Sequence, residues 1–593
     1  MTSSVWRTFD GAKHATRMLQ ACASVALVIG TAGAQTLPRV ERSASEWVRC
    51  GGVVDGTAGF AKAIDAAKLG AFTLVVDCPI LLHIGEDIGK PIFIDDGTSV
   101  RFGPQGKLIV DNVFVPAFVI ANASHVNLVD WRVEYRGQLP IDPQRDGYIN
   151  NGQFVAYPGP ARPAYAFNDI TLKDWLVRHK GVTFQSANPW WTGPISAMAV
   201  FHIRGSTDHL SVRGMQLTVP QAAGGHQFIP VAFSFIPGPR SGLTIASDTP
   251  FHETSYAVPH QLTFCNIVLD GTYMGWLGNV QDTTFSAVRS YRYGDLQDAS
   301  GGTVGGVGKW FPPPHLFYLN YDTTQSAGLF NRNLTLTQTE DRGPRIGVAR
   351  DLSASEPRSG YANSLKIGGN NIMVDGYSSH RPDGFLDLLP SDGLTIKGLH
   401  GQYDSNFLHG LYPGIRFPAT DYRNILIADS SISDAASGSG ATIQPVGGAG
   451  PNDNIHITGL SVAIGRWALN DYRRLEESAL RIYGTHHRVD LTYTIGGQVT
   501  VRSGRVDDIT WQMRALPSFT LAGSFSTLSW SVANAWSCNA SSGTWTAQGL
   551  SGSQQVTFAS EGTITYGLLC TAGSADAPQW VSPSVPVTYG APR

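Results

Sequence analysis

The sequence has few charged residues. Asp, Glu, Lys and Arg make up 15% of its 593 residues, against about 25% in an average globular domain. The formal net charge at pH 7 is −3, and binding to nucleic acid normally needs a concentrated excess of Lys and Arg, so a nucleic acid partner is not expected. The 66 glycines and the 10% of aromatic residues instead indicate many turns and few exposed helices.

Long apolar runs are missing after residue 34. Before it, a basic stretch from Arg7 to Arg17 is followed by an apolar run from Met18 to about Ile29 and by small residues up to Ala34, which is typical of a secretory signal peptide. That run is too short for a membrane span, and no later segment has about 18 consecutive apolar residues. We therefore predict cleavage near Ala34 and a secreted or periplasmic protein without a membrane span.

Cysteine motifs with metal-ligand spacing are also missing, and we expect neither a metal nor another cofactor. Cys50 with Cys78 and Cys538 with Cys570 are the sequence-local pairs, and we predict both as disulfides in an oxidising compartment. Each would stabilise the fold by about 3 to 4 kcal/mol in the loop-entropy estimate. We expect Cys265, the remaining cysteine of the mature chain, to be a small buried hydrophobic residue.

One helix is predicted near the start of the mature chain. Thr57 is the expected N-cap, Phe60, Ile64 and Ala67 follow at helical spacing, and Gly70 is the expected end. After this helix the chain consists of brief apolar segments separated by Gly, Asn, Asp and Pro, which is typical of short strands.

A two-strand repeat begins at about residue 197. Its first strands have the pattern apolar-x-apolar, and each is followed after a turn by a second such strand, often introduced by Asn or Gly. The first strands are expected at 201–203, 233–235, 317–319, 365–367, 386–388, 415–417 and 480–482, and the second at 210–212, 243–245, 334–336, 372–374, 394–396, 425–427 and 489–491. Such repetition predicts a stacked solenoid, with a β-sandwich as the main alternative.

The start of the chain resembles a known superfamily. Asp55-Gly56-Thr57, the helix through Ala67 and the segment from Phe72 to Val76 resemble the opening of pectin lyase-like right-handed parallel β-helix proteins, in which a short helix caps the open end of the coil. The resemblance covers about residues 45–510 and implies an all-β, solenoid catalytic domain at 35–512. The superfamily includes pectate lyases, polygalacturonases, other glycoside hydrolases, uronate epimerases and phage tailspikes, so it implies a polysaccharide or oligosaccharide partner without fixing the reaction.

Residues 513–593 differ from the repeat and resemble a bacterial immunoglobulin-like module. Trp530 precedes the first of its two cysteines and Trp545 lies between them, whereas the family usually has its Trp only between the cysteines. The resemblance implies an accessory domain.

The middle residues of the first strands form the candidate site. Because strand side chains alternate, these residues point outward, and neighbouring coils lie about 4.8 Å apart. They are His202, Ser234, Tyr318, Lys366, Asp387, Arg416 and Arg481. We expect Lys366, Asp387 and Arg416 within reach of one another, although a plain surface ion-pair ladder, which stabilises by under about 1 kcal/mol per pair, gives the same pattern.

Two reactions fit these residues. A glycosidase needs two carboxylates about 5 to 10 Å apart, which Asp387 with Asp375 or Asp404 would supply. A lyase needs a cation for the substrate carboxylate and a base, which Lys366, Arg416, Arg481 and Tyr318 would supply. The polygalacturonase signature is reduced to His409-Gly410, and an acidic calcium cluster typical of a pectate lyase is not evident.

Aromatic residues in Pro-rich segments are further candidates for sugar binding. Trp190, Trp191 and Trp310 are the ones we select, although packing onto the coil is an equally ordinary role for such rings. With Tyr318, Arg481 and His202 they complete the predicted substrate-binding set. The sequence thus predicts a polysaccharide-degrading enzyme, with hydrolysis ahead of β-elimination and a non-catalytic adhesin or glycan-binding protein as the alternative from another class.

Overall fold

The computed structural model describes most of the chain in segments. These are residues 39–84, 91–111, 116–136, 148–150, 153–155, 172–185, 199–220, 230–246, 249, 252–272, 274–292, 315–319, 328–344, 363–381, 384–403, 415–416, 422–434, 443–444, 453–463, 488–495, 498–505, 510–533, 537–572, 579–581 and 583–591. Two compact units, residues 1–381 and 382–593, are described in turn. In the described part of the chain, no helix has the length and apolar character needed to cross a membrane.

The first unit opens with β1 (Glu41–Ser43), a short 3-10 helix (Ala44–Glu46) and the predicted helix, α2 (Thr57–Gly70). The N-cap is Gly56 rather than Thr57. The capping oxygen comes from Asp55, whose carboxylate accepts hydrogen bonds from the Thr57 backbone N–H at 3.0 Å and from its hydroxyl at 2.6 Å. Ala71 in the left-handed conformation follows Gly70 and ends the helix.

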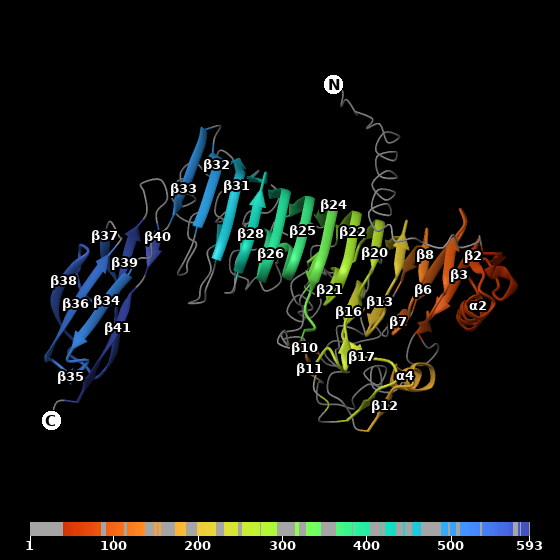
Figure 1. The fold of residues 1–593 in the computed structure, drawn as a ribbon, viewed down its shortest axis with the longest axis horizontal. Coiled ribbons are helices and arrows are strands. Elements are labelled where there is room, and N and C mark those ends of the chain that lie inside the picture. The colour runs from red at the N-terminus through yellow and green to blue at the C-terminus, as the bar shows by residue number, and fades with distance from the viewer. Residues whose placement is uncertain are drawn as a thin grey trace, which may run out of the picture. The chain divides into compact units, whose positions relative to one another are not determined.

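The strands of the first unit form a parallel β-helix with three strands in each coil (Figure 1). The first stack holds β4 (Ile92–Phe93), β7 (Phe118–Ala121), β13 (Ala199–Arg204), β16 (Val231–Ile236), β21 (Met274–Gly278), β23 (Phe317–Leu319) and the start of β25 (Asn363–Arg381). The second holds β2 (Thr73–Val76), β5 (Ser99–Phe102), β8 (Asn127–Val129), β14 (Ser211–Arg213), the first halves of β20 (Thr263–Asp270), β22 (Gln281–Arg292) and β24 (Arg332–Pro344), and the middle of β25. The third holds β3 (Pro79–His83), β6 (Lys107–Asp111), β9 (Arg132–Tyr135), β15 (Gln216–Thr218) and the ends of the same four long strands.

The third strand of each coil is the part that the two-strand repeat did not predict. The second and third strands meet at a single residue with positive φ, such as Asn266 (φ 56°), Ala287 (φ 53°) or Gly376 (φ 70°). A Cβ at Gly214, another such corner, would approach the Asp130 carboxylate oxygen to 2.2 Å, so this corner requires glycine. In the long strands β20, β22, β24 and β25 only one residue separates the second strand from the third, so the two form one continuous apolar pattern in the sequence.

The corner before the second strand also uses one left-handed residue in each coil. These residues are His125, His209, Gln261, Asp282, Asn333 and Asn371. Adjacent members of this column contact each other: Asn371 donates to Asn333 at 2.7 Å, Asn333 donates to Asp282 at 2.7 Å, and the rings of His125 and His209 lie 4.6 Å apart. Asn tolerates this backbone conformation, which explains why Asn often introduces the second strand.

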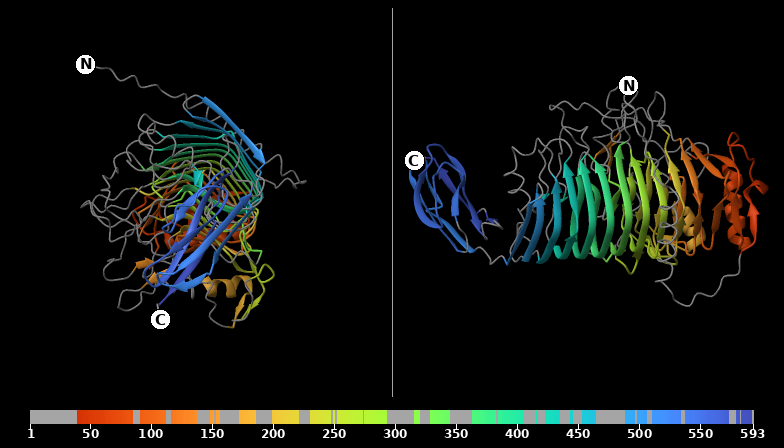
Figure 2. Two further views of the ribbon diagram at one scale, coloured as in Figure 1. Left: turned by 90° about the vertical axis from the view of Figure 1, so that its left-hand side faces the viewer. Right: turned by 90° about the horizontal axis from the view of Figure 1, so that it is seen from above.

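Aromatic side chains fill the interior behind the first stack. In register, Phe118, Phe201, Phe233, Trp276 and Phe317 occupy successive coils, and all five are fully buried. Neighbouring ring centroids lie 4.9, 5.1, 5.5 and 4.6 Å apart. Figure 2 shows the strands of this unit following one another as successive rungs.

The structure differs from the predicted repeat in two places. The coil containing β21 was missed, because Trp276-Leu277-Gly278 has an apolar middle residue and a glycine at an interior position. The segment 243–245 is not the second strand after β16. Its residues Thr244–Ile245 (β18) pair with β12 (Thr183–Phe184) in a separate small sheet, and the true second strand is the start of β20.

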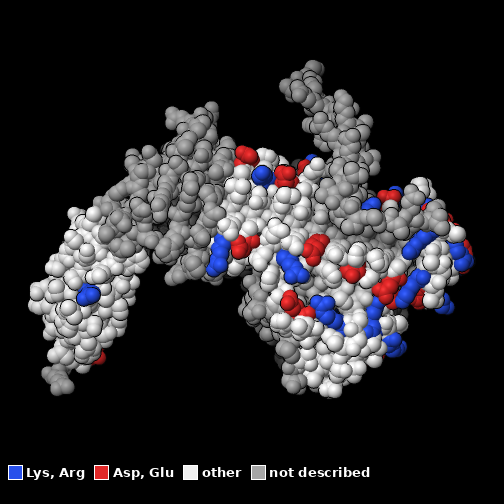
Figure 3. All heavy atoms as spheres, viewed as in Figure 1, with Lys and Arg blue, Asp and Glu red and all other residues white. Residues whose placement is uncertain are grey.

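Charged side chains gather over the N-terminal coils of the first unit (Figure 3). Arg101 of β5 pairs with Glu41 at 2.8 Å, and Lys107 of β6 pairs with Glu134 of β9. The first pair spans β2, which lies between β1 and β5, and the second joins adjacent coils. Such surface pairs stabilise by only about 0 to 1 kcal/mol each.

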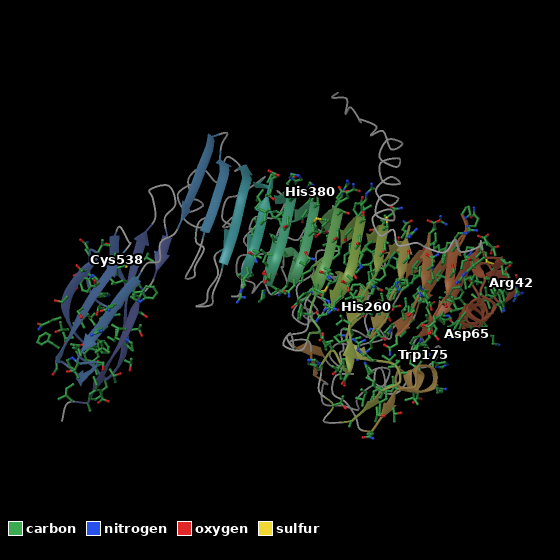
Figure 4. All side chains as sticks on the ribbon, viewed as in Figure 1. Arg42, Asp65, Trp175, His260, His380 and Cys538 are labelled. Carbon is green, nitrogen blue, oxygen red and sulfur yellow. A yellow bond between two sulfur atoms is a disulfide. The ribbon has the colours of Figure 1, made fainter. Side chains whose placement is uncertain are left out.

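An unpredicted helix, α4 (Leu172–Lys180), packs against the same end of the coil. Trp175 of α4, labelled in Figure 4, stacks on Phe93 of β4 with 4.9 Å between ring centroids. Buried Lys180 contacts the carboxylates of Asp95 at 2.5 Å and Asp96 at 2.8 Å. Burial alone would raise the pKa of Asp95, but hydrogen bonds from Lys180 and Lys68 outweigh burial and lower it.

Two further small strand pairs lie outside the large sheet. The hairpin β10 (Tyr148–Asn150) and β11 (Gln153–Val155) precedes α4 in the chain, and β17 (Gly238–Pro239) with β19 (Tyr256–Ala257) forms the other.

The second unit begins with the same three-strand pattern. β26 (Gly384–Tyr403) runs through all three positions of one coil, β27 (Ile415–Arg416), β28 (Tyr422–Ala428) and β29 (Ser431–Asp434) form the next, and β30 (Ile443–Gln444) with β31 (Asp453–Ala463) follows. β32 (Arg488–Ile495) pairs with β31 in parallel and with β33 (Gln498–Arg505) antiparallel, which ends the parallel stack. The predicted strand 480–482 lies outside the described residues.

The C-terminal part of this unit is a two-sheet sandwich that begins at Thr510. One sheet has the order β34 (Thr510–Leu516), β36 (Phe525–Ala533), β38 (Ser551–Thr557). The other has the order β35 (Phe519–Leu521), β41 (Ser584–Gly590), β39 (Gly562–Ala572), β37 (Ser537–Ser542), with β40 (Gln579–Val581) also on β39. Both sheets share one apolar core, in which Trp530 and Trp545 meet edge to face at 5.4 Å.

Both predicted disulfides are confirmed. Cys50 bonds to Cys78 in the first unit, and Cys538, labelled in Figure 4, bonds to Cys570. Cys538 and Cys570 are a directly opposed pair on adjacent strands β37 and β39 of one sheet. Cys265 is buried, as predicted.

Candidate functional site

The outward side of the first stack is here called the first face, and the long connections of the coil lead into or out of first-stack strands. Before first-stack strands, residues 136–198 separate β9 from β13, and residues 293–316 separate β22 from β23. After first-stack strands, residues 237–262 separate β16 from β20. The corner between second and third strands is short, from one residue within β20 to four residues between β5 and β6. Binding sites concentrate on connections held by a rigid scaffold, so the first face is the candidate site.

The predicted outward column exists in the first unit, with two additions, Val119 and Leu277. Its members in register are Val119, His202, Ser234, Leu277, Tyr318 and Lys366. Leu277, from the coil that the sequence pattern missed, separates Ser234 from Tyr318. The column therefore divides into an inner half around His202 and an outer half around Lys366.

The inner half of the column is covered instead of exposed. His202, Ser234 and Leu277 have no exposed side-chain surface. The Nδ1 atom of His202 lies 2.9 Å from the Ser234 hydroxyl, and its Nε2 atom has no hydrogen-bond partner in the described structure. Burial, with a smaller contribution from nearby Arg204, lowers the pKa of His202 well below its usual value, so this ring is neutral. His202 does not reach the surface as a substrate-binding residue would.

We expect His202 to make folding stability depend on pH. Its folded-state pKa lies below the unfolded value of 6.5. As the pH falls below 6.5, the unfolded chain therefore binds a proton at this residue and the folded chain does not. The free energy of unfolding then decreases by up to about 1.4 kcal/mol for each unit by which the pH is lowered. Urea unfolding from pH 7.5 to 5.0 should show a shallower loss of stability for His202→Asn than for the parent. Equal slopes for the two proteins would contradict this assignment.

The outer half of the column carries a cation over an aromatic ring. The Nζ atom of Lys366 lies 4.6 Å from the ring centroid of Tyr318 on the preceding coil, and both side chains are partly exposed. The buried ring of His315 lies 4.8 Å from that of Tyr318. Sequence reasoning missed His315, because it precedes the strand and takes no part in its alternation. Lys366 offers a positive charge and Tyr318 a phenol at one exposed point of the first face.

A buried polar network lies at the start of the strand that carries Lys366. The Ser364 hydroxyl donates to the Asp341 carboxylate and lies 2.7 Å from the Tyr377 hydroxyl. All three side chains are fully buried. Because buried polar groups with partners specify one geometry, this network fixes where the Lys366 strand begins.

In the second unit, Asp387 lies at the first-stack position of β26, in register with Arg416 of β27. Asp387 is 4% exposed, and its neighbours Leu386 and Leu388 are fully buried in the coil interior. The predicted adjacency of Asp387 and Arg416 is thus present in the backbone, with about 4.8 Å between the strands. The side chain of Arg416 is outside the described part, and the adjacency of Lys366 to Asp387 stays a prediction because these residues belong to different units.

The other predicted site residues fall elsewhere. Asp375 lies on the second stack, in register with Thr337, and its side chain is exposed on a different face from Lys366. Asp404, Arg481, Trp190, Trp191 and Trp310 lie outside the described residues. In the described segments, no three His, Cys, Asp or Glu side chains are grouped to hold a metal ion.

No protein-family model matches this sequence, and no curated protein sequence matches it. Among solved structures, similarity is found to PfbA, a surface adhesin of Streptococcus pneumoniae (9% identity, 80% of this chain and 96% of that chain, TM-score 0.35). It is also found to DFA-IIIase from Arthrobacter chlorophenolicus A6 (10%, 77% and 86%, TM-score 0.28) and to the Dettilon tailspike protein (7%, 90% and 78%, TM-score 0.25). At these scores the similarities say nothing about function, and the parallel β-helix is established by the strand pairing of this chain.

Proposed function

We propose that this protein is a secreted or periplasmic carbohydrate-active enzyme that cleaves a polysaccharide lying along the first face. The observations that support it most are the long connections that lead into and out of first-stack strands and the partly exposed Tyr318–Lys366 pair on that face. An extended polymer can follow a column of side chains that repeats at every coil. The two disulfides support an oxidising compartment.

Hydrolysis is the leading reaction in this proposal, with Asp387 as the first carboxylate. Asp387 is nearly buried at the first-stack position beside the backbone of Arg416, where a base, nucleophile or electrostatic stabiliser would act. Asp404, which directly follows β26, is the preferred second carboxylate. Asp375 is the less favoured candidate, because its side chain is exposed on the outward side of the second stack, here called the second face.

β-Elimination is the second candidate, and the Tyr318–Lys366 pair favours it. A lyase acting on a uronate-containing polymer needs a cation to neutralise the substrate carboxylate and a group that removes the neighbouring proton. Lys366 and Tyr318 would supply these two functions, with Lys366 Nζ 4.6 Å from the centroid of the Tyr318 ring.

Digestion of a panel of neutral and uronate-containing polysaccharides tests the proposal. Hydrolysis predicts new reducing ends without absorbance of a 4,5-unsaturated uronate, whereas β-elimination predicts both signals together. Lys366→Met should abolish the absorbance signal if the lyase assignment is right. Binding without either signal would leave a glycan-binding protein or adhesin and would reject the enzyme.

We propose that the C-terminal sandwich is an immunoglobulin-like accessory domain. Its sheets β34-β36-β38 and β37-β39-β41 correspond in order to strands A-B-E and C-F-G of such domains. The Cys538–Cys570 bond joins neighbouring strands of one sheet, whereas the usual bond joins two sheets, so the correspondence lies in strand order alone.

A further inference from the structure

Exposure changes along the outward column of the first face. The strand register extends this column back to Phe93 of β4, which pairs with Val119. The four members from Val119 to Leu277 are fully buried, whereas the next two, Tyr318 and Lys366, are partly exposed. Outward side chains of a bare strand meet solvent, so the buried members lie beneath other parts of the chain. In the first unit, the face is therefore closed from Val119 to Leu277 and opens at Tyr318.

Helix α4 lies over the N-terminal end of this column. Its Trp175 stacks on the outward ring of Phe93 with 4.9 Å between centroids. The next outward side chain of the same segment, Asp95, is 8% exposed and contacts Lys180 of α4 at 2.5 Å. Lys68 of α2 pairs with the same carboxylate. Because separating such buried charges is strongly unfavourable, α4 is a fixed part of the surface and not a mobile lid.

Two long connections from different coils are joined into one structure. α4 and β12 belong to the connection before β13, whereas β17, β18 and β19 belong to the connection after β16. The backbone N–H of Gly242 donates to the Lys180 carbonyl, and that of Thr183 donates to the Leu243 carbonyl, both at 2.9 Å. β12 and β18 then pair in parallel. We call these five elements the cover, and Figure 1 shows α4, β12 and β17 together on one side of the coil.

The cover also contacts the coil that carries His202. Arg204 points to the same side of β13 as His202 and is 2% exposed. A Cβ at Gly238 of β17 would approach the Arg204 Cγ atom to 2.9 Å, so the β17 backbone packs directly on the Arg204 side chain. The Asn122 side chain donates to the Pro239 carbonyl at 2.8 Å, which ties β17 to the preceding coil. The cover thus extends from the coil of β4 to the coils of β7 and β13.

We propose that the cover closes one end of the first face, so that the enzyme proposed above acts on a chain end of its polysaccharide and releases short products of one size. This inference rests on the proposed function. A polymer bound at an internal bond has to leave the face on both sides of that bond, whereas a chain end can stop against Leu277 and the cover. The terminal sugar would then contact Tyr318 and Lys366, the first open members of the column. A fixed stop places every chain at the same distance from the reacting groups, which gives one product size.

The first test uses the polymer that the parent cleaves best, labelled with a fluorophore at its reducing end and sampled early in the digestion. End action predicts one short product from the first time point and a slow fall in viscosity for the number of bonds cut. The label then identifies the end that enters. It appears in the short product if the reducing end enters, and it stays on the long chains if the other end does.

The second test removes both anchors of α4 with the double variant Trp175→Ala/Lys180→Met. Trypsin cleavage at Arg178 should become at least about tenfold faster as the helix undocks, and labelled fragments of many sizes should appear early because internal bonds gain access. Val177→Ala, at a residue 48% exposed on the same helix, is the matched control and should keep the parental trypsin resistance and product size. Far-UV circular dichroism checks that the coil stays folded, and the product size of the parent is a test that needs no variant.

Three results would overturn the end-acting assignment. They are labelled fragments of many sizes early in the parental digestion, unchanged trypsin resistance of the double variant, and faster trypsin cleavage with the parental product size. In each of these cases the polysaccharide is still cleaved, so the proposed function stands. Failure of the parent to cleave any polymer would reject the proposed function and this inference together.

Discussion

Replacing Asp387 by Asn is expected to reduce turnover of the cleaved polysaccharide at least about a hundredfold. The substitution removes the charge at nearly constant volume, and acid–base groups contribute about 10² to 10⁴ in rate. Asp387 is 4% exposed at the first-stack position of β26, in register with Arg416. Initial rates on the most active polymer of the panel, measured with matched melting temperatures, provide the check.

Asp375→Asn is the matched control for Asp387→Asn. Asp375 is exposed on the second face, in register with Thr337, so its loss should leave turnover within about twofold and stability within about 0.5 kcal/mol. If Asp387→Asn retained parental turnover while Asp375→Asn lost it, the reaction would belong to the second face. Parental turnover in both variants would leave Asp387 and Arg416 as a structural pair.

Replacing Phe233 by Ala is expected to lower the free energy of unfolding of the first unit by about 3 to 5 kcal/mol, because it leaves a large cavity in the interior. Phe233 is fully buried and stacks between Phe201 at 5.1 Å and Trp276 at 5.5 Å. The loss affects two neighbouring coils, and each coil is stabilised mainly by its neighbours. Urea unfolding followed by far-UV circular dichroism, which reports on the strands of the coil, measures the change.

Met373→Ala is the control for the interior substitution. Met373 lies on the second stack and is 45% exposed, so its removal should cost no more than about 0.5 kcal/mol. Phe233→Leu should fall between the two, since it retains an apolar side chain and leaves a smaller cavity. A loss below about 1 kcal/mol for Phe233→Ala would show that the aromatic column does not hold the coils together.

The sequence pattern predicted most strands of the first stack, but it missed one coil and all of the third strands. Alternation placed His202, Ser234, Tyr318 and Lys366 in one column, and the strand register agrees. It missed the coil at Trp276 because Leu277 and Gly278 break the pattern, and it missed the third strands because one residue at each corner does not interrupt an apolar run. It assigned Thr244–Ile245 to the coil because a short apolar segment looks the same in any sheet.

The sequence by itself determined properties that depend on neighbours along the chain. These are the α2 helix, the pairing of Cys50 with Cys78 and of Cys538 with Cys570, and the alternation that separates inward from outward residues. Only the tertiary structure decided which outward residues are exposed. His202 and Lys366 occupy equivalent positions in the repeat, yet His202 is fully buried and Lys366 is partly open. Burial depends on which distant segments pack over a strand, and the alternation of residues within that strand does not indicate those segments.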